Sequence, residues 1–147
     1  MDKCKVVTRI LDGEFLNYKN VIPSTWETRI RVNRSNLQDC FERISLISSS
    51  SVEKEKKYPV KVVVDIGKVT ISCTNQTGDA KEELFISTEG KNLEAGFNPK
   101  YFLDSLKVID DEEVFVEFGS SISPCLIKST ENNDYVYMIL PIRIKED

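Results

Sequence analysis

The chain has 147 residues, of which 40% are hydrophobic and 30% charged, a balance typical of a globular domain with a sizeable core. It contains no histidine, which excludes Cys-His and Ser-His nucleophile pairs and histidine-dependent metal sites. The net charge of −4 excludes a protein that binds nucleic acid over its whole surface, so any DNA contact requires a local basic patch.

The sequence also predicts a cytoplasmic protein. No apolar run approaches the roughly 20 residues that a membrane helix needs, and residues 1–4 lack the layout of a secretion signal. The cysteines are far apart and form no C-x-x-C pair, so we expect reduced thiols rather than a disulfide or zinc framework. We expect Cys40 and Cys73 to be inert core thiols.

Residues 1–24 are predicted to be a tail followed by a linker. Lys5 to Ile10 is an apolar and β-branched run before the turn signal Asp12-Gly13, which predicts a strand. Glu14 to Pro23 has no clean period and ends on a proline, as a packed connector does.

A helix and three strands follow. Glu27 to Val32 is extended, and Asn33 or Ser35 can cap a helix with apolar positions Leu37, Cys40, Phe41, Ile44 and Ile47. Ser48 to Lys57 is rich in serine and charge and predicts a mobile surface loop. The strands are predicted over Tyr58–Ile66, Val69–Cys73 and Glu82–Ser87, before a turn at Gly90.

The same order then repeats. After a strand over Leu93–Phe97, Asn98-Pro99 caps and begins a helix that buries Phe102, Leu106 and Ile109 and ends at Asp110-Asp111. Strands are predicted over Val114–Phe118, Ile122–Lys128 and Tyr135–Ile144, with a hairpin turn at Glu131–Asp134. Alternation in the last strand would bury either Tyr135, Tyr137 and Ile139 or Val136, Met138 and Leu140.

The two helices share one residue pattern. Asn33, Leu37, Asp39, Phe41 and Ile44 recur at the same spacing as Asn98, Phe102, Asp104, Leu106 and Ile109. The chain is therefore predicted to be an α+β protein built from two βαβββ repeats, about 27–90 and 91–144, with both helices packed on one side of antiparallel sheets.

Four segments carry a resemblance to a known family: LDGEFLNYKNVIP at 11–23, EAGFNPKYFLDSLK at 94–107, Ser121–Pro124, and YVYMILPIRI at 135–144. With them the chain resembles the bacterial DNA sliding clamp, the beta subunit of DNA polymerase III. The resemblance implies the DNA-clamp fold. It makes 25–145 the third, C-terminal domain and 1–24 the last strand of the preceding domain plus a linker. It also implies a fragment of a processivity factor, a homodimeric ring that tethers the replicative polymerase to duplex DNA without catalysis or cofactor.

In that family a hydrophobic groove accepts clamp-binding peptides from the DNA polymerase III alpha subunit, the clamp loader and repair polymerases. The positions that match it are Leu16, Val21, Asn98, Tyr101, Ile122, Pro124, Leu140, Pro141, Ile142, Arg143 and Ile144. An aliphatic anchor would gain by burial in such a groove, while Asn98 and Arg143 orient the peptide. From the residues alone, Asn98 is equally well a simple helix cap, and the terminal run a core strand.

The resemblance also implies a ring interface at Leu46 and Ile47, and a DNA channel lined by Arg34, Arg43, Lys100 and Lys107 that would contact phosphates without reading bases. On the residues alone, the first pair could close the core and the four cations could be ordinary solvated charges.

Two other functions stay open. Asp110, Asp111 and Glu113 could hold magnesium in a nuclease or phosphoryl-transfer domain, although four acids in a row at 110–113 are also typical of a solvated turn, and we assign no metal. A stand-alone clamp-fold interaction protein is the other alternative. We also expect self-association through exposed apolar residues at Lys5–Ile10, Leu16 and Leu46-Ile47.

Overall fold

The structure, a computed structural model, describes residues 4–48, 58–76 and 78–144. Their elements, in chain order, are η1 (Tyr18–Asn20), β1 (Thr28–Asn33), α1 (Arg34–Ser48), β2 (Val60–Asp65), β3 (Lys68–Asn75), β4 (Gly78–Phe85), β5 (Ser87–Gly90), β6 (Leu93–Phe97), α2 (Pro99–Leu106), β7 (Glu113–Phe118), β8 (Cys125–Ser129) and β9 (Val136–Ile139). The loop predicted over Ser48–Lys57 lies outside the described residues except for Ser48, which is the buried last residue of α1.

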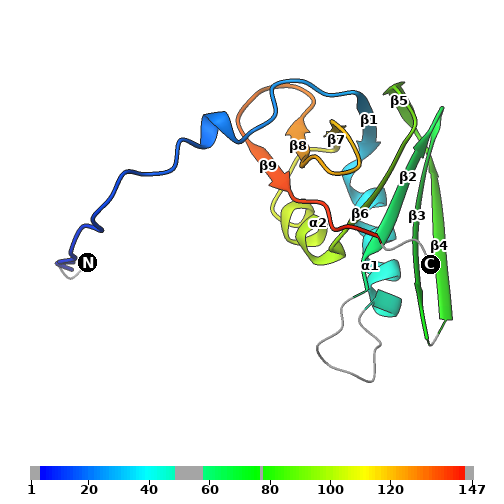
Figure 1. Ribbon diagram of the computed structural model, residues 1–147, viewed down its shortest axis with the longest axis horizontal. Coiled ribbons are helices and arrows are strands. Elements are labelled where there is room, and N and C mark those ends of the chain that lie inside the picture. Colours follow the sequence, from blue (N-terminus) through cyan, green and yellow to red (C-terminus); the bar gives the residue numbers. More distant parts are fainter. Residues whose placement is uncertain (1–3, 49–57, 77, 145–147) are drawn as a thin grey trace.

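The strands form two antiparallel sheets, and each sheet combines strands from both repeats (Figure 1). Sheet A has the order β5-β1-β7-β8-β9, and sheet B has the order β4-β3-β2-β6. The first strand of each repeat pairs with a strand of the other repeat. In sheet A, β1 pairs with β7, and in sheet B, β6 pairs with β2. The two βαβββ repeats are confirmed, and they are interlocked rather than separate.

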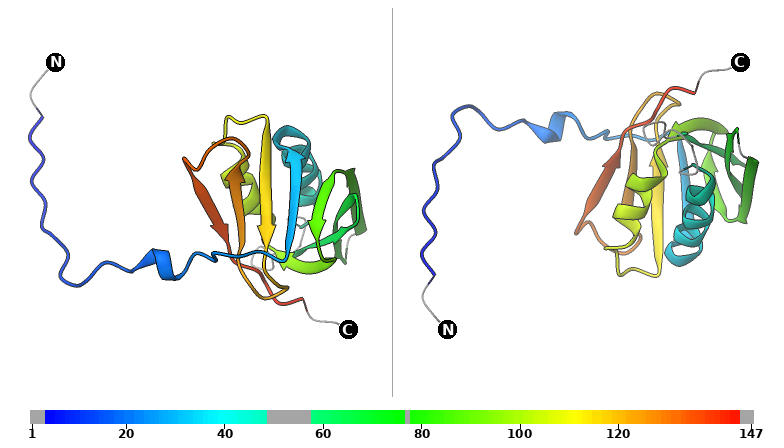
Figure 2. Two further views of the ribbon diagram at one scale, coloured as in Figure 1. Left: turned by 90° about the horizontal axis from the view of Figure 1, so that it is seen from above. Right: turned by 90° about the horizontal axis from the view of Figure 1, so that it is seen from below.

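Both helices lie side by side and cover the same side of the sheets (Figure 2, right). The Phe41 ring of α1 stacks on the Phe102 ring of α2, with centroids 4.3 Å apart. Each helix begins at a capping asparagine, since the Asn33 side chain accepts from the Asn36 N–H and the Asn98 side chain accepts from the Lys100 N–H, both at 3.0 Å. The predicted repeat of the helix pattern is thus confirmed in three dimensions.

One core serves both repeats. Leu37 and Ile44 from the first helix pack in the same buried cluster as Phe97, Phe102 and Leu106 from the second repeat. Cys40, Cys73 and Cys125 are buried in it, and burial raises the pKa of each thiol. The prediction of unreactive core thiols at Cys40 and Cys73 agrees with this burial.

The chain changes sheets near the end of each repeat, which the sequence did not predict. The single strand predicted over Glu82–Ser87 is two strands, because at Ile86 the chain leaves sheet B and β5 pairs with β1 in sheet A. The strand predicted over Tyr135–Ile144 likewise ends at Ile139, since Pro141 has no N–H with which to continue it. The chain then crosses to sheet B, where Ile142 forms a bridge with Gly96 of β6.

Two further predictions need correction, and a third stays a prediction. Lys5–Ile10 pairs with none of the described residues and its apolar side chains are exposed, so the strand of a preceding domain expected there stays a prediction. Helix α2 ends at Leu106 rather than Asp110-Asp111, although Ile109 is buried as expected. Strand β8 starts at Cys125 instead of Ile122, because a turn closed by the Ser123 N–H and the Ser120 carbonyl occupies the preceding residues.

In and just before β9, Tyr135, Tyr137 and Ile139 pack toward the core, as one of the two predicted alternatives required. Trp26, just before β1, packs on sheet A through Arg29, whose guanidinium lies 4.6 Å from the centre of the Trp26 ring and 4.5 Å from that of the Phe115 ring. In the part of the chain that the structure describes, no helix combines the length and apolarity of a membrane span.

Candidate functional site

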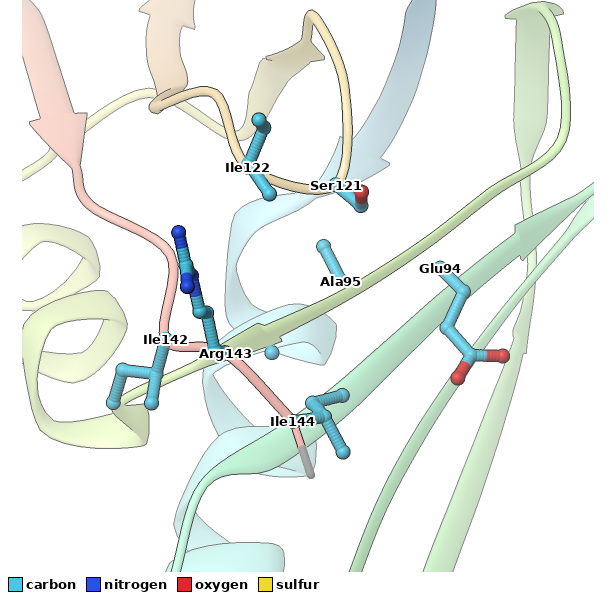
Figure 3. Close-up of a pocket in the computed structure, with 8 residues that line it drawn as sticks. Glu94, Ala95, Ser121, Ile122, Ile142, Arg143 and Ile144 are labelled. Carbon is cyan, nitrogen blue, oxygen red and sulfur yellow. The ribbon is translucent and has the colours of Figure 1, made fainter. Parts of the chain in front are cut away.

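A hollow of about 460 Å³ lies between the end of the chain, strand β6 and the loop before β8 (Figure 3). Four of the residues predicted to form a peptide groove line it together: Ile122, Ile142, Arg143 and Ile144. They come from two segments well separated in sequence, so only the fold brings them to one place. The other lining residues are Glu94, Ala95, Gly96 and Ser121.

The tail after β9 (residues 140–144, called the C-terminal tail below) forms one wall of this hollow. The Ile142 N–H donates to the Gly96 carbonyl at 2.7 Å, and this is the bridge that holds the tail on β6. Leu140 is 61% exposed and Ile142 40% exposed. Exposed aliphatic side chains on a partly held segment can give an apolar ligand a surface to bury.

The start of α2 lies beside this tail (Figure 3), and its residues have structural roles of their own. Asn98 caps the helix through its side-chain oxygen. Tyr101 is 53% exposed, and its carbonyl accepts from the Ser105 hydroxyl at 2.9 Å. The cap alternative for Asn98 is thus confirmed. Neither Asn98 nor Tyr101 lines the hollow, and a contact of either with a ligand stays a prediction.

The remaining groove candidates lie in three other places. Leu16 and Val21 are exposed on the N-terminal segment, which leads away from the body of the molecule (Figure 1). Pro124 is half-buried just before β8, and Pro141 is half-buried in the C-terminal tail. The structure therefore brings the second-repeat candidates close together and leaves Leu16 and Val21 apart from the hollow.

Glu94, Ala95, Gly96 and Ser121 were missed by the sequence analysis. A signal was available for Gly96, since a glycine inside a strand often marks the close approach of another backbone. Here a Cβ on Gly96 would lie 2.6 Å from Cγ1 of Ile144 and 2.7 Å from the carbonyl oxygen of Ile142. The tail passes directly over this glycine.

The four candidate DNA-contacting residues differ in the hydrogen bonds and ion pairs that they already form within the protein. Arg34 donates to the main-chain carbonyls of Asp111 and Leu106 at 3.2 and 3.3 Å. Arg43 forms an ion pair with Glu82 at 2.7 Å, and this pairing lowers the pKa of Glu82. Lys107 lies 4.0 Å from Glu42. Lys100 is exposed at the start of α2.

The two candidate interface residues lie in the last turns of α1. Leu46 is 69% exposed, whereas Ile47 is half-buried and packs against the core. Ile47 therefore contributes to the core, Leu46 is exposed, and the ring-interface role of the pair stays a prediction.

Two of the three acidic residues considered for magnesium, Asp111 and Glu113, contact other side chains. The Tyr135 hydroxyl donates to Asp111 at 2.7 Å, and Glu113 forms an ion pair with Arg31. Hydrogen bonds from Ser129 and Tyr135 lower the pKa of Asp111. Within 4–48, 58–76 and 78–144, no cluster of three or more acidic or cysteine side chains is arranged to hold a metal ion.

Known proteins resemble this chain in both sequence and fold. Residues 19–143 match the family of the DNA polymerase III beta subunit, C-terminal domain. The beta sliding clamp of Pseudomonas putida is 30% identical over 138 residues, which cover 93% of this chain and 36% of that protein.

Solved structures also resemble this chain in fold. The DNA polymerase III beta subunit of Thermotoga maritima superimposes with a TM-score of 0.83 at 33% identity, over 91% of this chain and 35% of that one. A sliding clamp of Pseudomonas aeruginosa solved with bound griselimycin has a TM-score of 0.81 at 31% identity, over 90% and 35% of the two chains. The chain thus spans about a third of the length of these relatives. It belongs to the DNA polymerase III beta subunit family, as a member of that family's C-terminal domain.

Proposed function

We propose that this chain is the C-terminal part of a ring-shaped sliding clamp that tethers a replicative DNA polymerase to duplex DNA. Family membership and the two interlocked βαβββ repeats support this proposal. Because the chain spans about a third of its relatives, the ring and the tether are properties that it would contribute to rather than possess alone. A replication role of this kind belongs in the bacterial cytoplasm.

In this proposal residues 1–24 are the last strand of a preceding domain and the linker from it. Val6, Val7 and Ile10 are each more than 80% exposed, and the described residues offer them no partner strand. A run of exposed apolar side chains is costly in water and is stabilised when another sheet covers it.

The single observation that carries the peptide-binding part is the meeting of Ile122, Ile142 and Arg143 at one hollow. An extended peptide can bury leucine and phenylalanine side chains against the exposed aliphatic residues of the tail. The Arg143 guanidinium supplies donors that orient peptide carbonyls. The relative that was solved with griselimycin supports a ligand-accepting surface in this family.

The proposed partners are the alpha subunit of the polymerase, the clamp loader and repair polymerases, each through a clamp-binding peptide. Leu16 and Val21 would complete the groove together with a preceding domain, which is consistent with their exposure. Leu46 would contact the neighbouring subunit of the ring.

For DNA, we propose weak and salt-sensitive phosphate contacts from the two helices. Lys100 and Lys107 are the better donors, since Arg34 is bound to main-chain carbonyls and Arg43 to Glu82. Such contacts carry no sequence information, as a sliding ring requires.

We further propose that the chain has no catalytic activity. The carboxylates that a magnesium mechanism would need are Asp110, Asp111 and Glu113, and two of these are engaged by Tyr135 and Arg31. Metal-dependent cleavage of DNA that is lost in Asp111→Asn would overturn this part of the proposal.

An NMR titration with a short peptide tests the groove. The peptide carries a glutamine followed by spaced leucine and phenylalanine residues, and we expect shifts at the amides of Val21, Tyr101 and Ile142. A second peptide with both apolar anchors replaced by alanine is the control and should cause none. Shifts confined to Ile66 and Phe85 would contradict the proposal. These two exposed apolar residues belong to the first repeat and do not line the hollow.

A further inference from the structure

The C-terminal tail occupies the place on sheet B that β5 occupies on sheet A. After β4 the chain crosses to sheet A, and β5 pairs with β1, the first strand of the same repeat. After β9 it crosses to sheet B, and the tail meets β6, the first strand of the second repeat. The tail is thus an incomplete edge strand.

The attachment of this edge strand is minimal. Strand β5 pairs with β1 at four successive positions, from Thr28 with Gly90 to Arg31 with Ser87. The tail makes one bridge, in which the Ile142 N–H donates to the Gly96 carbonyl at 2.7 Å. Its position therefore depends on how closely it can approach one residue of β6.

Gly96 permits that approach because it has no side chain. A Cβ there would lie 2.7 Å from the main-chain oxygen of Ile142 and 2.6 and 3.1 Å from Cγ1 and Cδ1 of Ile144. Turning the Ile144 side chain could relieve two of these contacts, but the contact with the Ile142 carbonyl is relieved only if the backbone moves. Gly96 does not have a positive φ, so its own backbone conformation is open to alanine.

We infer that Gly96 is a positioning residue for the peptide site: by leaving room for the tail against β6, it fixes where Ile142 and Arg143 stand at the hollow. This inference rests on the proposed peptide-binding function. Gly96 itself need not touch the peptide, because it acts through the tail that passes over it.

The test is Gly96→Ala in the full chain, followed by two measurements. Hydrogen exchange of the Ile142 amide reports the seating of the tail without any ligand, and we expect it to be about tenfold faster in the variant. Fluorescence anisotropy with the clamp-binding peptide reports the site, and we expect an affinity about tenfold weaker. The amides of β2, which pairs with the other edge of β6, should exchange as in the wild-type protein.

Gly119→Ala is the matched control. Its added methyl would meet only the Ser123 side chain, at 3.2 Å to Cβ and 3.3 Å to Oγ, so we expect wild-type exchange at Ile142. A second variant, Ile144→Ala, adds no atom to β6 and removes the side chain that lies over Gly96. We expect it to accelerate exchange at Ile142 several-fold, which keeps the test decisive if Gly96→Ala folds poorly.

The outcomes separate the inference from the proposed function. Unchanged exchange at Ile142, accelerated exchange throughout β2, or a loosened tail with full peptide affinity would each overturn the role of Gly96. If the wild-type protein itself fails to bind the peptide while its Ile142 amide is protected, the proposed peptide site is wrong and the positioning role falls with it.

Discussion

The two repeats of this domain share one core but end very differently. At the end of the first repeat, β5 pairs with β1 over four residues and extends sheet A as a regular strand. At the end of the second repeat, the tail is joined to β6 by a single bridge at Ile142. The same crossing between sheets therefore produces a firm edge in one case and a loosely held edge in the other.

This difference indicates where a duplicated scaffold can acquire a specific site. Residues that hold the repeats together, such as Phe41 and Phe102, are buried and constrained by both halves. Leu140 and Ile142, which follow the last strand, are exposed and free of ladder constraints except at one position. The proposed binding surface lies where the repeat pattern stops.

The largest expected effect comes from disrupting the hydrophobic core that the two repeats share. Phe102→Ala removes a ring that stacks on Phe41 and contacts Phe97 edge-on at 5.3 Å, so we expect a loss of about 3–5 kcal/mol in the free energy of unfolding. Urea denaturation followed by circular dichroism and by Trp26 fluorescence measures it. Because both sheets contain strands of both repeats, the two probes should report one transition. Two separate transitions would show that the repeats unfold independently.

A second prediction compares the two repeat ends directly. Leu140→Ala and Ile142→Ala should each weaken peptide binding about tenfold, because each removes exposed apolar surface from the tail. Phe85→Ala is the matched control, since Phe85 is 84% exposed at the end of the corresponding strand β4. It should leave the affinity unchanged and the stability within about 0.5 kcal/mol. Equal losses in all three variants would remove the distinction between the two ends.

A third prediction concerns pH and the Asp111–Tyr135 contact beside β9. Hydrogen bonds from Ser129 and Tyr135 hold the pKa of Asp111 below its ordinary value of 3.8. A pKa that is lower in the folded than in the unfolded state stabilises the protein above the unfolded value, and this contribution is lost as pH falls through the folded value. The difference in Tm between the wild-type protein and Asp111→Asn should therefore be larger near pH 7 than near pH 3. A difference in Tm that is independent of pH would contradict this assignment.

The smallest expected effect tests whether the weakly attached C-terminal tail lets solvent and reagents reach the core beneath it. Cys125 of β8 pairs with Ile139 of β9, next to the tail, and Cys73 lies in β3 of the first repeat. Both are buried, and burial raises the pKa of each thiol, whereas Cys4 is exposed. A thiol reagent should therefore modify Cys4 quickly and the other two only at the rate of unfolding. Faster modification of Cys125 than of Cys73, followed by mass spectrometry, would show that the second end is open.

The sequence predicted the elements of this fold better than their ends. Helix caps at Asn33 and Asn98 and the buried residues of both helices follow from local patterns, which a sequence displays directly. The crossings at Ile86 and after Ile139 depend on which sheet edge is open, and that is a property of the assembled molecule. Lys5–Ile10 has the composition of a strand, but a strand also requires a partner.

Of the groove residues that the resemblance implies, Ile122, Ile142, Arg143 and Ile144 line one hollow, and their contact with a peptide stays a proposal. It did not identify Gly96, whose proposed role comes from the atoms that pass over it rather than from its own chemistry. A residue that acts by having no side chain is recognised only when its neighbours are known.

The exchange of first strands between the sheets has a consequence for how the chain could be divided. If the backbone were opened at Asn92, between the two repeats, the first fragment would hold β1 without the sheet it completes, and the second would hold β6 in the same situation. Each fragment would expose an unpaired edge that only the other can satisfy, with Phe41 and Phe102 to be reunited at their interface. Each polypeptide would be an incomplete domain on its own, and the two would reconstitute the domain when mixed, as the halves of a split reporter do.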